Sequence, residues 1–160
     1  MNESNQTLGT GVEFNEYEQY IPLLLRVTIA FLWIWMAVVP KMIFPEPRFG
    51  MVSKSWVMPL MPISPQMLVY SLAVVELFLG VLLLIGLWTR VVSAIQIALT
   101  VIFIIGLVNL AAAQGLTSPL THLLLKDIPL IAGSLVLIIT GGGAYSIDRR
   151  RKNSSPGWMV

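Results

Sequence analysis

Glu76 lies near the middle of the apolar run 67–87 and is the only charged residue in that run. The run is long enough to cross a bilayer as a helix. A charge at that depth costs about 2.5–3.5 kcal/mol on insertion scales, and such residues usually face a partner, a cavity or a proton path. A neutral carboxylic acid in an apolar pocket could also donate a hydrogen bond, or relay a proton, to a carbonyl ligand.

Other polar residues enter the apolar part of the chain near the same depth. A rise of 1.5 Å per residue places Glu76 about 14 Å below the outer end of its span. The long side chain of Lys126 can bridge the remaining difference in depth, so we predict that Lys126 pairs with Glu76. Asp127 would then pair with Lys41 or His122. Arg26 is expected to reach the inner headgroups instead.

These positions predict a polar chamber in the outer half of the membrane, with Glu76 as its floor. The predicted catalytic or proton-relay residues are Glu76, Lys126 and Asp127, and the predicted ligand-binding residues are Lys41, Asn109, His122 and Trp33. A structural interpretation stays open, because intramembrane ion pairs can simply set helix register and stabilise a bundle by about 1 kcal/mol.

Two further motifs each allow two interpretations. Trp33 and Trp35 lie in the middle of an apolar span, where they are either packing or lipid-facing bulk or a flat wall for a quinone-like ring. The triplet Gly141–Gly143 resembles part of a phosphate loop, but it lacks the Walker spacing and follows an apolar run. We therefore expect the triplet to end a helix.

Composition places the chain in a membrane. Of its 160 residues, 56% are hydrophobic and 11% are charged, against about 25% charged in soluble domains. With no cysteine and a single histidine, a metal or haem centre of its own is not expected. The net charge of +2 gives no indication of nucleic-acid binding.

The elements that position these residues are apolar runs of about 20 residues, the length that a membrane helix needs. Backbone polar groups in lipid must be satisfied within the segment, which requires helices. We predict an all-α integral membrane protein, an antiparallel four-helix bundle. The expected parts are a polar acidic tail (1–20), the bundle (21–140) with spans at 22–44, 67–87, 91–113 and 120–140 and a Pro-rich outer loop (45–66), and a basic tail (141–160).

Basic residues indicate the orientation. Arg149–Lys152 follow the last span and Arg90 lies in the second turn, whereas 113–120 contains no lysine or arginine. The positive-inside rule therefore predicts a cell-membrane protein with both termini on the cytoplasmic side. The counter-evidence is three basic residues in or beside the outer loop, Lys41, Arg48 and Lys54. The prolines of that loop argue against regular helix. Trp56 and Tyr70 are its expected interfacial anchors.

Several sequence elements together resemble the DoxX/DoxD family of small four-helix membrane proteins, over roughly residues 20–149. The matching elements are Arg26, Lys41, Glu76-Leu-Phe-Leu-Gly80, Leu84-Ile-Gly-Leu-Trp-Thr-Arg90, His122-Leu-Leu-Leu-Lys-Asp127 and Gly141-Gly-Gly-Ala-Tyr-Ser-Ile-Asp148. The resemblance implies association with oxidoreductase systems. DoxD proteins resemble the membrane subunit of a thiosulfate:quinone oxidoreductase, and DoxX proteins are linked to thiol and oxidative-stress complexes.

Three functions are compatible with these features. The first is a membrane subunit of a quinone-linked oxidoreductase, with quinone as the ligand and Glu76 as its proton donor. The second is a non-catalytic accessory subunit that packs against a larger membrane complex. The third is a small transporter, which would need a homo-oligomer to supply a pore. The expected partners are the lipid bilayer and either other subunits or further copies of the chain, and not nucleic acid.

Overall fold

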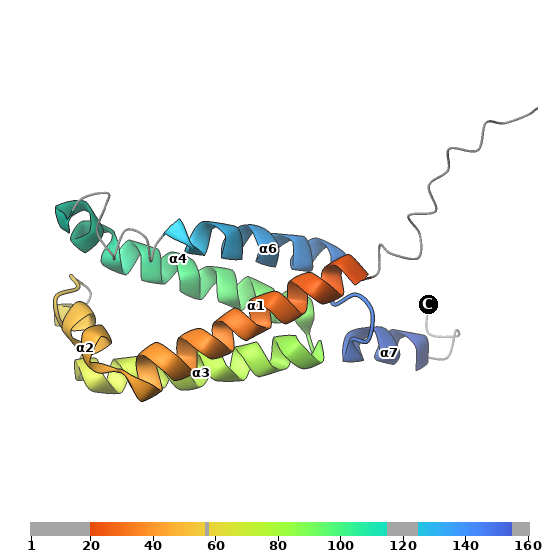
Figure 1. Cartoon of the computed structure of the whole chain (residues 1–160), viewed down its shortest axis with the longest axis horizontal. Helices are drawn as coiled ribbons and strands as arrows, with labels where there is room; N and C mark the ends of the chain where they lie inside the picture. Colours follow the sequence, from red (N-terminus) through yellow and green to blue (C-terminus); the bar gives the residue numbers. More distant parts are fainter. Residues whose placement is uncertain (1–19, 57, 115–124, 155–160) are drawn as a thin grey trace, which may run out of the picture.

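The computed structural model describes residues 20–56, 58–114 and 125–154, and within these ranges the chain is helical without any strand (Figure 1). The predicted all-α fold is therefore confirmed. The helical elements are α1 (Tyr20–Val38), the π-helical turn η1 (Val39–Ile43), α2 (Glu46–Ser53), the 3₁₀ turn η2 (Met58–Leu60), α3 (Pro65–Ile85), α4 (Thr89–Gln114), α6 (Asp127–Thr140) and α7 (Ile147–Ser154).

Three helical stretches of the described chain are long and apolar enough to cross a membrane. They are Tyr20–Ile43, Pro65–Ile85 and Thr89–Val108, with mean hydropathies of 2.0, 2.6 and 2.7. The fourth expected span, 120–140, begins outside the described residues, and its described part is the apolar 14-residue helix α6. The acidic tail at 1–19 also lies outside them.

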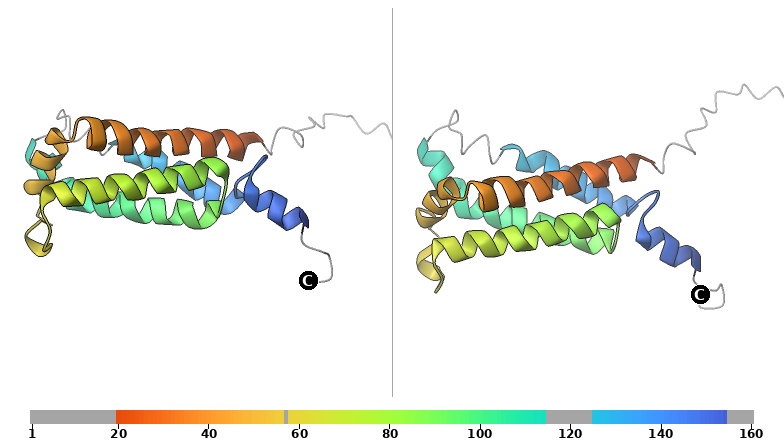
Figure 2. Two further views of the ribbon diagram at one scale, coloured as in Figure 1. Left: turned by 90° about the horizontal axis from the view of Figure 1, so that it is seen from below. Right: turned by 60° about the horizontal axis from the view of Figure 1, so that its bottom comes forward.

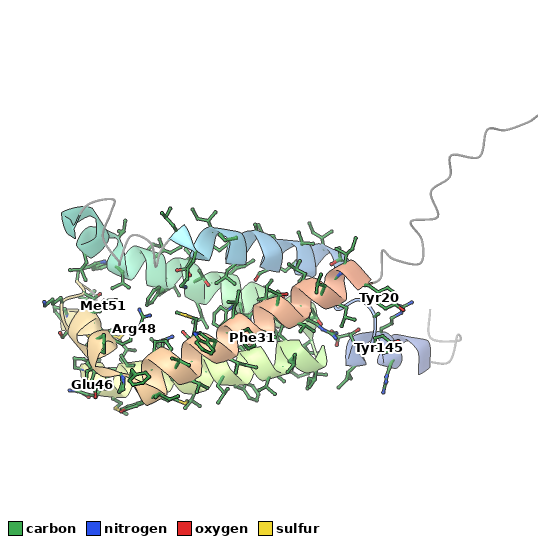
Figure 3. The ribbon with its side chains drawn as sticks, in the orientation of Figure 1. Tyr20, Phe31, Glu46, Arg48, Met51 and Tyr145 are labelled. Atoms are coloured by element: carbon green, nitrogen blue, oxygen red, sulfur yellow. The ribbon has the colours of Figure 1, made fainter. Side chains whose placement is uncertain are left out.

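The long helices pack side by side, with the short ones at the two ends. α1 packs against α3, and α4 packs against α6. α2 contacts α3 and η1 at one end, whereas α7 lies at the other end, where α1 begins (Figures 1 and 2). Tyr20 and Tyr145 mark that second end, called here the α7 end (Figure 3).

Small residues let α1 and α3 approach closely. Ala30 and Ala37 of α1 and Ala73 of α3 are fully buried. A Cβ built on Gly80 would lie 2.8 Å from Ile34 Cγ1 and 3.3 Å from the Ala30 carbonyl oxygen. Only a glycine fits there without a shift of α1, as expected for membrane helices that associate through small residues.

The core is small, and the outward faces are apolar. The core consists of Ile29, Ala30, Trp33, Leu79, Leu83, Val92 and Leu137. Large apolar side chains such as Phe31, Trp35 and Phe78 are more than half exposed. A water-soluble protein does not expose so much contiguous apolar surface, so these faces are suited to contact lipid.

Local sequence signals set the ends of the helices. The Ser64 hydroxyl accepts a hydrogen bond from the Met67 N–H at 3.2 Å, and Pro65 follows in the first turn of α3, an arrangement typical of a helix start. α3 ends at Gly86 in the left-handed conformation, with φ of 71°. α6 ends at Gly141, with φ of 78°, which confirms the predicted role of the glycine triplet.

The Pro-rich outer loop is more ordered than the sequence suggested. The expectation that its prolines prevent regular helix is wrong for 46–53, which form α2. Proline is tolerated in the first turn of a helix, where its missing N–H has no intrahelical partner, and Pro47 occupies that turn. Farther on, the Trp56 indole donates a hydrogen bond to the Ile105 carbonyl at 3.0 Å, which joins the loop to α4.

Candidate functional site

A cavity of about 180 Å³ lies among the membrane helices at the end covered by α2. Most of its lining is apolar, with side chains such as Leu32, Met36, Leu72, Leu99 and Phe103. For comparison, an apolar cavity of about 150 Å³ in another protein accommodates benzene. This cavity therefore has room for a single six-membered ring.

The charged floor of the cavity is an ion pair between Lys41 and Glu76. The side chains of both residues are largely sealed from solvent, with 7% and 15% of their surface exposed. The prediction that Lys126 pairs with Glu76 is therefore wrong. Lys41 follows a helix that packs directly against α3, whereas Lys126 precedes α6, which packs mainly against α4.

The turn η1 brings Lys41 toward the helix interface. Pro40 has no N–H, so it cannot donate the usual i→i−4 hydrogen bond. The chain opens into a wider π-helical turn, in which the Phe44 N–H reaches the Val39 carbonyl at 3.0 Å. Lys41 is 5% exposed within this turn. Such turns are rare and often occur at functional sites.

A second acid–base pair lines the same cavity. The Lys126 amine lies 2.5 Å from Asp127 Oδ1, and the side chains are 37% and 4% exposed. Asp127 is thus paired with its neighbour in sequence and not with Lys41, which pairs with Glu76, while the alternative partner His122 lies outside the described residues. Asp127 Oδ2 is buried and makes no hydrogen bond to any described residue.

Arg48 of α2 contributes a further cation to the cavity wall. Its side chain extends from α2 toward the bundle (Figure 3), and within the described part of the chain its guanidinium makes a long contact of 3.7 Å to Met51 Sδ. Burial lowers the pKa of Arg48, while Glu76 and Asp127 oppose the shift. With Lys41 and Lys126 there are three cations against two carboxylates. From the sequence, Arg48 bore only on the orientation in the membrane, because the loop around it was expected to lack helix.

The structure separates the two tryptophans that the sequence placed together. Trp33 is 7% exposed and lines the cavity, whereas Trp35 is 51% exposed and faces outward. Trp33 is thus a cavity wall and a core residue at once. Of the other predicted ligand-binding residues, His122 lies outside the described residues. Asn109 falls on α4, but its side chain is likewise not described.

A polar stripe on α4 is absent from the site residues predicted from the sequence. Thr89, Ser93 and Gln96 are fully buried, and Thr100 is 8% exposed. Their spacing of i, i+4, i+7 and i+11 places all four on one helix face. That spacing is visible in the sequence, but uncharged polar side chains cost much less in an apolar run than charges do, so they give a weaker signal.

Arg26 corrects another prediction, because it does not reach out to the headgroups. It is 2% exposed, and its Nη1 donates to the Gly142 carbonyl at 2.9 Å. Asp148 binds the start of α4 nearby, since its two oxygens accept the N–H groups of Trp88 and Thr89, both at 2.8 Å. These contacts tie the segment after α6 to α1 and α4 at the α7 end.

Fold and site together define an all-α membrane protein with a mostly apolar, charge-lined cavity among its helices. A family model described as DoxX matches residues 21–110, more than half of the chain. The chain therefore belongs to the DoxX family, as the sequence resemblance predicted. No curated protein and no solved structure matches it significantly.

Proposed function

We propose that this protein is the quinone-binding membrane subunit of an oxidoreductase complex. The observation that carries the proposal is the cavity of about 180 Å³, with an aromatic wall at Trp33 and the Lys41–Glu76 pair beside it. Small-molecule sites are typically mostly apolar, with a few polar groups that fix orientation. A quinone headgroup has that chemistry: an apolar ring with carbonyl oxygens at opposite sides.

Each side chain has a role in this proposal. The indole of Trp33 stacks against the quinone ring. The Lys41 ammonium donates a hydrogen bond to one carbonyl oxygen and stabilises the negative charge that develops there on reduction. Glu76 delivers protons to the reduced oxygen, so that quinone, two electrons and two protons give the quinol. The electrons come from a partner subunit that carries a redox cofactor.

The membrane arrangement forms part of the same proposal. The fourth expected span, 120–140, of which α6 is the described part, completes an antiparallel bundle. Both termini lie in the cytoplasm. The start of α1 and α7 lie at one end of the bundle, which supports this arrangement (Figures 1 and 2). A sulfur compound such as thiosulfate is the electron source that the DoxD resemblance suggests.

Quinone binding by the purified full chain tests the proposal. Decylubiquinone and a menaquinone analogue are titrated into the protein in nanodiscs, and binding is followed by quenching of tryptophan fluorescence. We expect Glu76→Gln to weaken binding about tenfold, the effect of losing a charge-assisted hydrogen-bond network worth about 1.4 kcal/mol. Glu46→Gln is the matched control, because Glu46 is exposed at the start of α2. Equal affinity in all three proteins would contradict the proposal.

A non-catalytic accessory subunit is the second candidate, and one observation favours it. The carboxylates of both acid–base pairs already have a cation within the chain, so neither carboxylate needs a ligand to be compensated. In that case no quinone would bind saturably, and the protein would co-purify in stoichiometric amounts with subunits that carry cofactors.

A further inference from the structure

The polar stripe of α4 joins the cavity to the opposite end of the bundle. Thr100, at one end of the stripe, lines the cavity together with Glu76. Thr89, at the other end, begins α4 at the α7 end. Eleven residues separate the two, which corresponds to about 16 Å of helix, or about half of a hydrocarbon core of ~30 Å.

Most polar atoms of this stripe have no partner within the described chain. Thr89 Oγ1, Ser93 Oγ and both amide atoms of Gln96 are buried and make no hydrogen bond to any described residue. Thr100 Oγ1 donates to the Gln96 carbonyl at 2.8 Å. Buried polar groups are costly when unsatisfied. Internal water is the usual partner, because one buried water makes about three hydrogen bonds to such groups.

Polar groups continue beyond Thr89 at the α7 end. Thr89 Oγ1 and Ser146 Oγ lie 2.7 Å and 3.0 Å from the position that a Cβ on Gly142 would occupy. Arg26 reaches the Gly142 carbonyl from α1. The stripe therefore leads from the cavity to a polar cluster next to α7, and no charged residue lies along its length between Arg90 and Thr100.

We propose that this face of α4 holds a file of water molecules that carries protons between the α7 end and the cavity. Water and hydroxyl groups each accept one proton and pass on another, so Thr89, Ser93 and Thr100 take part without titrating. Gln96 anchors the file with its carbonyl and amide groups. The path ends in the cavity at Glu76, whose carboxylate receives the proton. The path itself does not depend on which ligand the cavity binds, and delivery to a quinone rests on the proposed function.

Single cysteines test this path, because the natural chain contains none. Ser93→Cys and Thr100→Cys place a thiol in the stripe, and Ala94→Cys and Ala98→Cys place one on the exposed face of the same helix. The full chain in nanodiscs is transferred to D₂O, and the S–H stretch is followed by infrared spectroscopy. Exchange requires that a proton leave the thiol and a deuteron replace it.

We expect both thiols of the stripe to exchange at least tenfold faster than both control thiols. Ag⁺ displaces the proton of a thiol and binds the resulting thiolate, so it should also react faster with the thiols of the stripe. This reaction is measured as protection of the thiol from maleimide labelling after the protein is denatured. Equal rates in all four variants would overturn the proposal. Fast exchange at Thr100→Cys with slow exchange at Ser93→Cys would also overturn it, because only the cavity would then be hydrated. Quinone binding is measured separately, so a failure of the path and a failure of the proposed function are distinguishable.

Discussion

At the scale of single residues, the Lys41–Glu76 pair is the contact on which the site depends. It joins η1 to α3 at the cavity and compensates the one carboxylate in the apolar run of α3. An ion pair in a poorly hydrated place need not add net stability, because the desolvation of both groups offsets their attraction. Removal of only one of the two side chains, however, leaves the other charge without compensation.

A double-mutant cycle tests this account. We expect Lys41→Met and Glu76→Leu to lower the free energy of unfolding by about 3 kcal/mol each, the usual loss when one partner of a buried pair is removed. The double variant, with two apolar side chains of similar size, should recover most of that loss. Unfolding in mixed detergent–SDS micelles measures all four proteins. Strictly additive losses would show that the two side chains do not interact.

The identity of the charged residues could be predicted from the sequence, but their pairing could not. Glu76, Lys41, Lys126 and Asp127 stand out because each charge is expensive in an apolar context, and all four line one cavity. Depth along the membrane alone suggested Lys126 for Glu76. The choice of partner depends on which helices touch and on the π-helical turn at Pro40, and neither is encoded in hydropathy.

At the scale of elements, the contact between α1 and α3 holds the site in place. Gly80 sits against Ile34 and Ala30, one turn beyond Glu76. Ala73 and Gly80 are small residues on the helix face of Glu76 that leave room for a close neighbour, and α1 is that neighbour. The contact between Asp148 and the start of α4 fixes the other end of the bundle.

Two glycine substitutions should have opposite effects. Gly80→Ala should destabilise the protein by about 1–3 kcal/mol, because the added methyl group is forced against the backbone of α1. Gly50→Ala should be neutral or stabilise it by up to about 1 kcal/mol, since alanine is the better helix former and nothing lies within 4 Å of its Cβ position. Unfolding in mixed detergent–SDS micelles measures the stability of both variants against that of the wild-type protein. A stable Gly80→Ala variant would refute the close packing.

Other elements show where sequence patterns are weaker. Helix α2 was not expected, because six prolines near the outer loop suggested irregular chain, yet a proline in the first helical turn is compatible with helix. The polar stripe of α4 was also missed. Its threonine, serine and glutamine residues cost much less in an apolar span than charges do, so their common face becomes evident only once burial is known.

At the scale of the whole molecule, the described helices divide into a charged, hollow end under α2 and a tightly tied end at α7. The apolar outer faces suit lipid, and the cavity gives a membrane-soluble molecule a place among the helices. Residues 20–43, 65–85 and 89–108 supply the long apolar helices. Hydropathy was sufficient to predict these, because length and apolarity alone define a membrane helix.

Photoaffinity labelling with an azidoquinone tests the central claim most directly. The wild-type protein in nanodiscs should be labelled saturably on cavity-lining peptides around Trp33 and Leu72, and excess unlabelled quinone should abolish the label. Leu72→Trp, which fills the cavity, should lose this labelling, whereas Val74→Trp on the exposed face of α3 should keep it. Labelling confined to exposed faces, or labelling unaffected by competitor and by Leu72→Trp, would contradict the claim that this cavity is a quinone site.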